Sequence, residues 1–107
     1  MIKIMNMHQE RPSKSYDYRV DRVSPVGNPY KMKQESDRDL VCDKYEKWFI
    51  NCLSHPKEHP YFMEYLHRML DTFLIEKKIR LFCWCDPKRC HAQTIVDYLL
   101  GKLYVPK

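Results

Sequence analysis

Residues 79–101 read IRLFCWCDPKRCHAQTIVDYLLG, and this segment decides the interpretation of the fold. Its first part, residues 81–84, is a short apolar run that is typical of a strand buried on both faces. A proline after Asp86 ends this run near Cys85. Beyond the break, apolar residues recur at three- and four-residue spacing, which predicts a helix that Gly101 can end. The segment is therefore predicted to form a strand, a tight loop and a helix.

The loop between this strand and this helix concentrates reactive and charged side chains. In an open α/β sheet, such a loop lies at the carboxyl edge of the strand, where N–H groups at a helix start face a bound ligand. Lys88 and Arg89 are cations at a helix start, where the helix dipole favours negative charge. An anionic ligand would remove this conflict, although solvation of two loop side chains also explains it.

Length and composition favour one folded domain that spans residues 1–107. The chain is 44% hydrophobic and 13% aromatic, which is typical of a protein with a core. No apolar run approaches the roughly 20 residues that cross a bilayer, and the first residues do not lead into a signal-peptide segment. We therefore expect a cytoplasmic protein that has no membrane partner.

Cysteine usage and charge narrow the chemistry. The five cysteines cannot all pair within one chain, so they are expected to be thiols or metal ligands. The net charge of +5 favours an anionic partner, but the 19 basic and 14 acidic residues are interleaved. Nucleic acid is a possible partner that no basic block or helix-turn-helix spacing supports. A homo-oligomer is also possible.

The rest of the chain supplies two strands and two helices. Alternation over residues 2–7 predicts a first strand, and residues 16–20 predict a shorter second one. Residues 36–53 have helical apolar spacing, and Ser36 with Asp39 resembles a capping box. A second helix begins near Pro60. The order strand, strand, helix, helix, strand, helix indicates a small three-layer α/β sandwich with a partly parallel sheet.

Residues 24–30, SPVGNPY, form a second candidate site. Each proline pushes the residue before it, Ser24 or Asn28, out of the α region, and Gly27 allows a positive φ or a close backbone approach. The resulting stiff loop presents the Asn28 amide, which can both donate and accept hydrogen bonds. The alternative is an ordinary turn in which Asn28 caps its own backbone.

Three features in this order resemble a known family. They are Tyr18 and Arg22 before a serine, the Gly27-Asn28-Pro29-Tyr30 loop, and the motif C-W-C-x-P-x-x-C-H at residues 83–91. Together they resemble the bacterial and phage family catalogued as domain of unknown function 4326, over roughly residues 16–100. The resemblance implies a compact Rossmann-like α/β domain, often phage-encoded and then located in the host cytoplasm. It supplies no activity.

The chain departs from the family pattern at two positions in the first loop. A glycine usual before the arginine is Asp21 here, and a tryptophan usual before the G-N-P sequence is Val26. The contacts that this loop makes with a ligand are therefore expected to differ from those of other members.

The leading hypothesis is a pocket for a small phosphorylated, nucleotide-like ligand. Loops that follow neighbouring parallel strands meet at one edge of a sheet, so the G-N-P loop and the cysteine loop are expected to share a pocket. N–H groups near Cys90 and His91 would hold phosphate, Asn28 would bind a polar edge, and an aromatic ring would stack on the ligand. A phage origin suggests a host nucleotide signal as the ligand. The predicted binding residues are Arg22, Ser24, Gly27, Asn28, Pro29, Tyr30, Trp84, Lys88 and Arg89.

Two alternatives give the cysteine loop another role. In a thiol-dependent enzyme that acts on a nucleotide derivative, Cys90 would be the nucleophile, with its pKa lowered by the helix start and nearby cations, and His91 would carry the proton. In an interaction module, Cys83, Cys85 and Cys90 with His91 would bind structural zinc, although adjacent residues on a helix diverge. Apart from this possible zinc, no cofactor is expected.

Two further interpretations concern Cys83. Its spacing to Arg89 matches the C-x5-R pattern of thiol phosphatases, but the loop lacks the glycines of those enzymes. In the simplest interpretation, Cys83 and Cys85 are core thiols without a chemical role.

Overall fold

A parallel three-stranded sheet forms the base of the molecule in the computed structural model, which describes residues 1–85 and 88–105. The strands are β1 (Ile2–Asn6), β2 (Asp17–Arg19) and β3 (Ile79–Cys83), in the order β1-β3-β2. Ile2 is paired with Ile79 and Asp17 with Arg80. Because β3 lies between the other two strands, four of its five residues are buried, as the apolar run predicts.

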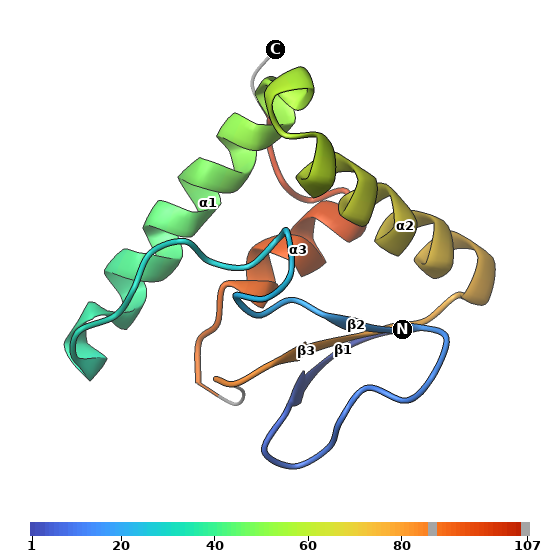
Figure 1. The fold of residues 1–107 in the computed structure, drawn as a ribbon, viewed down its shortest axis with the longest axis horizontal. Coiled ribbons are helices and arrows are strands. Elements are labelled where there is room, and N and C mark those ends of the chain that lie inside the picture. The colour runs from blue at the N-terminus through green and yellow to red at the C-terminus, as the bar shows by residue number, and fades with distance from the viewer. Residues whose placement is uncertain (86–87, 106–107) are drawn as a thin grey trace.

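Three helices complete the fold, and all lie on one side of the sheet (Figure 1). They are α1 (Arg38–Ser54), α2 (Pro60–Glu76) and α3 (Ala92–Leu99), with short 3-10 turns η1 (Glu35–Asp37) and η2 (Pro56–Glu58) before α1 and α2. The predicted α/β class, the parallel pairing and the order of the elements are confirmed. No helix in the described part of the chain has the length and apolar character needed to cross a membrane.

The opposite face of the sheet is covered by the connection between β1 and β2. The chain crosses the sheet from β1 to β2 and returns from β2 to β3, and right-handed crossovers in opposite directions lie on opposite faces. In Figure 1 the 7–16 loop accordingly runs on the side away from the helices. Arg80 of β3 contacts this loop through an ion pair with Glu10. The third layer is therefore a loop and not a helix.

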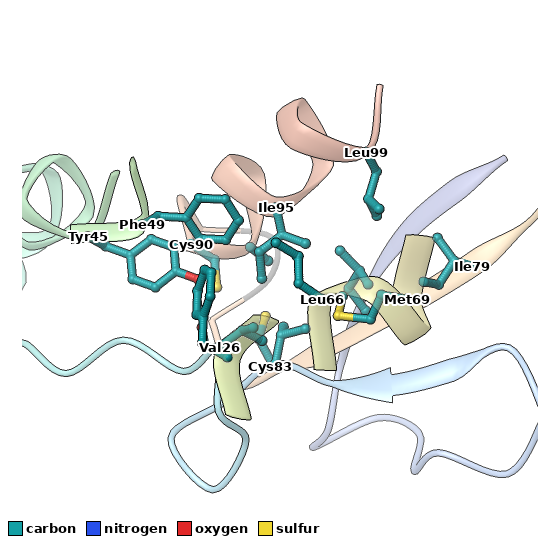
Figure 2. Close-up of a cluster of buried hydrophobic side chains, with 14 of the residues drawn as sticks. Val26, Tyr45, Phe49, Leu66, Met69, Ile79, Cys83, Cys90, Ile95 and Leu99 are labelled. Atoms are coloured by element: carbon teal, nitrogen blue, oxygen red, sulfur yellow. The ribbon is translucent and has the colours of Figure 1, made fainter. Parts of the chain in front are cut away.

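The hydrophobic core lies between the sheet and the helices. Figure 2 shows Ile79 and Cys83 of β3 in one cluster with side chains from all three helices. Because each helix contributes apolar side chains to the same cluster, the sheet and the helices share one hydrophobic core. The helix residues that meet there include Tyr45, Phe49, Leu66, Met69, Ile95 and Leu99.

The helix ends show one correction. Ser36 lies inside η1 and α1 begins at Arg38, so the expected capping box does not form. Pro60 is the first residue of α2, as expected. Gly101 has a φ of 72° and ends α3, because a residue without Cβ adopts the left-handed conformation without strain.

Candidate functional site

A pocket of about 440 Å³ opens where β2 and β3 end beside the start of α1. Its walls come from the end of β2 and the segment that follows it, within residues 19–32, from the first turns of α1, and from the loop after β3. The two segments singled out in the sequence therefore line one cavity, at the carboxyl edge of the sheet. The lining residues are Arg19, Asp21, Arg22, Val23, Asn28, Tyr30, Met32, Arg38, Val41, Cys42, Trp84, Cys85, Arg89, Cys90 and His91.

The expected site residues divide into two groups. Those in the pocket wall are Arg22, Asn28, Tyr30, Trp84, Cys85, Arg89, Cys90 and His91. Ser24, Gly27, Pro29 and Lys88 do not line it, and neither does Cys83. The second group shapes or flanks the pocket without facing its interior.

Gly27 and Ser24 have structural roles in the first loop. A Cβ atom on Gly27 would lie 2.3 Å from the carbonyl oxygen of Asp21 and 2.6 Å from the Cα of Arg22. The glycine is required by this close approach and not by a positive φ, which among the described glycines only Gly101 adopts. The Ser24 hydroxyl donates to the Asp21 carbonyl at 2.9 Å, which closes the same turn.

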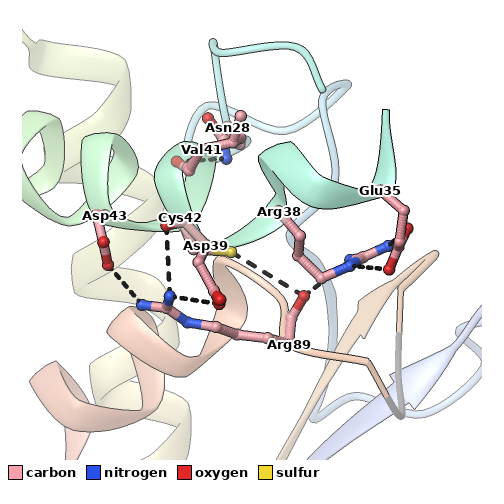
Figure 3. Close-up of polar contacts among 8 residues, drawn as sticks. All are labelled: Asn28, Glu35, Arg38, Asp39, Val41, Cys42, Asp43 and Arg89. Atoms are coloured by element: carbon pink, nitrogen blue, oxygen red, sulfur yellow. Dashed lines mark hydrogen bonds and ion pairs between the residues drawn. The ribbon is translucent and has the colours of Figure 1, made fainter. Parts of the chain in front are cut away.

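Asn28 joins the first loop to α1. Its Oδ1 accepts a hydrogen bond from the Tyr30 N–H at 2.8 Å, so its carbonyl oxygen caps its own turn. Its Nδ2 lies 3.5 Å from the Val41 carbonyl of α1 (Figure 3). Asn28 is 7% exposed. The alternative of an ordinary turn is therefore correct for the Asn28 oxygen, and only the amide nitrogen is left to donate a hydrogen bond to a ligand.

Arg22 differs from the other three arginines of the pocket wall. Arg19 is paired with Asp21, Arg38 with Glu35, and Arg89 with two carboxylates of α1. Arg22 donates to the Tyr30 carbonyl at 3.0 Å and has no ion pair with any residue in the described part of the chain. It is the cation best placed to meet an anion in the pocket.

Arg89 and Lys88 have protein partners. The Arg89 guanidinium reaches Asp39 at 2.9 Å and Asp43 at 2.8 Å, while its carbonyl accepts a hydrogen bond from Arg38 at 2.8 Å (Figure 3). Lys88 lies 3.5 Å from Glu35. The conflict of these cations with the helix dipole is thus relieved by acidic side chains, and Arg89 attaches the cysteine loop to α1.

The phosphatase interpretation is wrong, because Cys83 and the Arg89 guanidinium do not face a common site. Cys83 is 1% exposed and belongs to the core, and the Arg89 guanidinium is turned toward carboxylates of α1. A phosphatase loop needs both groups around one phosphate.

Three thiols lie together at the pocket: Cys85 and Cys90 line its wall, and Cys83 belongs to the hydrophobic core. The Cys90 thiol is hydrogen-bonded to both Cys83 and Cys85, and these bonds together with burial raise its pKa far above the ordinary value. The hydrogen bond from Cys90 is the largest influence on Cys85; although burial opposes it, a further bond from Arg38 helps to lower the pKa of Cys85 to about 5. The expected lowering of the Cys90 pKa is therefore not found, because the anionic form is stabilised at Cys85 instead.

His91 is a buried, neutral imidazole. Burial lowers its pKa below the ordinary value despite the hydrogen bond between Nε2 and the Val20 carbonyl. Since a carbonyl only accepts, Nε2 carries the proton and Nδ1 is an acceptor. Nδ1 lies 3.5 Å from the Cys90 sulfur. Nδ1 of His91 can therefore accept a hydrogen bond from the Cys90 thiol.

The zinc alternative gains no support from this geometry. Within residues 1–85 and 88–105, no group of three or more His, Cys, Asp or Glu side chains is arranged to hold a metal ion. His91 uses Nε2 for the Val20 carbonyl, and the Cys83 sulfur is enclosed in the core.

Trp84 has a fixed orientation at the pocket rim. Its Nε1 donates to Asp21 at 2.8 Å, its ring meets His8 edge-on, and the guanidinium of Arg11 lies 5.1 Å from the ring centroid. Trp84 as a whole residue is 39% exposed. The Asp21 contact also gives a role to a position where the chain departs from the family pattern.

Arg38 is the main site residue that sequence reasoning missed. It lies in the first turn of α1, where the helix dipole disfavours a cation. The argument that drew attention to Lys88 and Arg89 applies equally to this position and could have found it.

The fold and the pocket define a small α/β protein with a cavity at the edge of its sheet. A family model described as a domain of unknown function (DUF4326) matches residues 4–101, so the chain belongs to that family. This confirms the family resemblance seen in the sequence. No curated protein matches the chain. No solved structure matches it.

Proposed function

We propose that this protein binds a small phosphorylated, nucleotide-like ligand in the 440 Å³ pocket. The observation that carries the proposal is the position of Arg22, a cation without a carboxylate partner among the described residues, on a cavity with aromatic walls. Ligand pockets in proteins are typically about 300–1,000 Å³, largely apolar, and contain a few polar groups that orient the ligand. This pocket has those features.

Different residues of the pocket wall would contact the phosphate and the base of the ligand. Arg22 supplies charge for a phosphate group, because an arginine can donate two parallel hydrogen bonds to phosphate oxygens. Tyr30 and the exposed part of Trp84 offer ring surfaces for a base, while Met32 and Val41 provide apolar contact. Asp21 does not repel an anion strongly, since its carboxylate is paired with Arg19 and bonded to Trp84.

The test is thermal unfolding with a panel of nucleoside mono-, di- and triphosphates, each paired with its unphosphorylated nucleoside. A ligand at about 100 times its Kd stabilises the folded state by about 2.7 kcal/mol, so a binding nucleotide should raise the Tm by about 10 °C. The matched nucleoside should have a much smaller effect. A panel that includes nucleotide signals of bacterial hosts also tests the suggested biological ligand.

The Arg22→Gln variant connects the binding to the pocket. Loss of charge-assisted hydrogen bonds of about 1.5–3 kcal/mol should weaken nucleotide affinity at least about tenfold. Arg68→Gln is the matched control, because Arg68 is exposed on α2 and does not line this pocket. If no nucleotide raises the Tm, or if Arg22→Gln binds as tightly as Arg68→Gln, the proposal is wrong.

A further inference from the structure

We propose that Cys85, and not Cys90, is the nucleophilic residue of this pocket, and that its sulfur forms a covalent bond with an electrophilic carbon of a bound anionic compound. The identity of the electrophile as an anion rests on the proposed function. The choice of Cys85 rests on the arrangement of the thiols.

Access distinguishes Cys85 from the other cysteines. It lines the pocket and is only partly buried, whereas the other four cysteines are buried. Cys42 also lines the pocket, but burial raises the pKa of its thiol. Cys52 lies in the core, where burial raises its pKa to about 11. Of the five cysteines, Cys85 is therefore the one most accessible to a compound in the pocket and the one with the most reactive thiol.

Two donors converge on the Cys85 sulfur. The Cys90 thiol, which lies just before α3, donates a hydrogen bond to it. The guanidinium of Arg38, the first residue of α1, donates a second one. Arg38 is held in place by Glu35 and by the Arg89 carbonyl, at 2.8 Å each. Glu35 weakens the effect of Arg38 slightly, since its negative charge raises the pKa of Cys85. The balance of these contacts stabilises a thiolate that faces the cavity.

The chemical step needs no oxidant or reductant. A lone pair of the Cys85 thiolate forms a new S–C bond, while the bond between that carbon and its leaving group breaks. The leaving group departs with the bonding electron pair as an anion, or takes a proton from water. Because the thiolate is already deprotonated, no general base has to remove a proton first.

Cys90 is then a positioning residue. It donates to the Cys85 sulfur, and its own sulfur lies 3.5 Å from Nδ1 of His91. At 6% exposure it has little contact with the cavity. When Cys85 loses its negative charge in the reaction, the proton on Cys90 still has an acceptor in His91, so the cluster stays hydrogen-bonded.

Alkylation with iodoacetamide at pH 6, followed by peptide mapping, tests the choice of thiol. At this pH a thiol of pKa about 5 has roughly 300 times the thiolate fraction of an ordinary cysteine, and its lower intrinsic nucleophilicity offsets about 40-fold of that. Cys85 should therefore react roughly tenfold faster than free cysteine and before the other four thiols. Faster reaction at Cys90 or Cys42, or no selective site, would overturn the proposal.

Variants distinguish the nucleophilic residue from the residues that hydrogen-bond to its sulfur. Cys85→Ser should abolish the fast modification. Arg38→Gln should slow it several-fold at pH 6 and shift the midpoint of its pH profile upward, while Arg68→Gln should leave both unchanged. Cys90→Ser should retain modification at Cys85, because a hydroxyl can still donate to the sulfur. Fast labelling that survives in Cys85→Ser and is lost in Cys90→Ser, with the fold intact by circular dichroism, would assign the nucleophile to Cys90 and overturn the proposal.

Iodoacetate tests the anionic part of the proposal. The ratio of its alkylation rate to that of neutral iodoacetamide should exceed the ratio for free cysteine, and Arg22→Gln should reduce it. A ratio equal to that of free cysteine would reject an anionic electrophile even if Cys85 is selective. Nucleotide binding by Cys85→Ser is measured separately. Absence of nucleotide binding with selective Cys85 labelling would reject the proposed function alone, and binding without selective labelling would reject the nucleophile alone.

Discussion

Gly27 shows how one absent side chain shapes the pocket. Its Cα lies against the backbone of Asp21 and Arg22, so Gly27→Ala should push the first loop outward and displace Arg22. We expect a loss of about 1–3 kcal/mol in the free energy of unfolding and weaker nucleotide binding. Both are measured by thermal unfolding with and without nucleotide.

Gly101→Ala is the control for this substitution. It introduces a Cβ at a positive φ but with nothing within 4 Å, so it should cost about 1 kcal/mol and leave nucleotide binding unchanged. Equal binding by both alanine variants would contradict the role given to Gly27.

Side-chain roles at this scale were predictable where they depend on near neighbours. Asn28 caps a turn two residues on, which its position before a proline suggested. Arg89 was misjudged because its partners, Asp39 and Asp43, are about fifty positions away in the chain and face it only after α1 packs on the loop. The sequence indicates Cys85 only as a possible zinc ligand or core thiol, because Arg38, which lowers its pKa, comes from a distant helix.

At the scale of elements, Tyr45 connects α1 to the first loop. Its hydroxyl donates to the Val26 carbonyl at 2.6 Å, and the side chain is fully buried (Figure 2). Tyr45→Phe leaves this carbonyl without its partner in the core, so we expect the free energy of unfolding to fall by about 1–3 kcal/mol. Chemical denaturation measures this loss.

Tyr61→Phe provides the comparison, because Tyr61 is 78% exposed and its substitution should change stability by less than about 0.5 kcal/mol. If the two variants were equally stable, the buried hydrogen bond would not hold the loop against α1.

The types and order of the elements follow from periodicity, but their arrangement does not. The apolar run in residues 81–84 predicted a buried strand, which lies at Ile79–Cys83, and the apolar spacing from Ala92 to Leu100 predicted the last helix. No local sequence pattern indicates that β3 lies between β1 and β2, or that the 7–16 loop covers the second face of the sheet in place of a helix. Both features depend on pairing between strands that are far apart in the sequence. Because β2 has only three residues, its sequence carries little information about its pairing partner.

For the whole molecule, this loop-covered face should govern stability in acid. The Asp17 side chain is fully buried there and accepts two hydrogen bonds from Arg80, at 2.7 and 2.8 Å, across the β2–β3 pair. Ser13 and Lys14 donate backbone N–H groups to the same carboxylate, at 2.8 Å each. Burial alone would raise the pKa of Asp17, but these bonds outweigh it and lower the pKa to about 2. The loop and the sheet are therefore joined through an ionised carboxylate.

A carboxyl group whose pKa is lower in the folded state stabilises the protein above its unfolded pKa, and that stabilisation is lost as the pH falls through the folded pKa. For Asp17 the contribution should be complete above about pH 4 and decline toward pH 2. Denaturant unfolding of the native protein and of Asp17→Asn should differ by about 2 kcal/mol at pH 5–7, and the difference should shrink between pH 4 and pH 2. The exposed Asp71→Asn serves as the control and should show no such convergence. A constant difference between Asp17→Asn and the native protein down to pH 2 would mean that the ionised carboxylate does not hold the loop to the sheet.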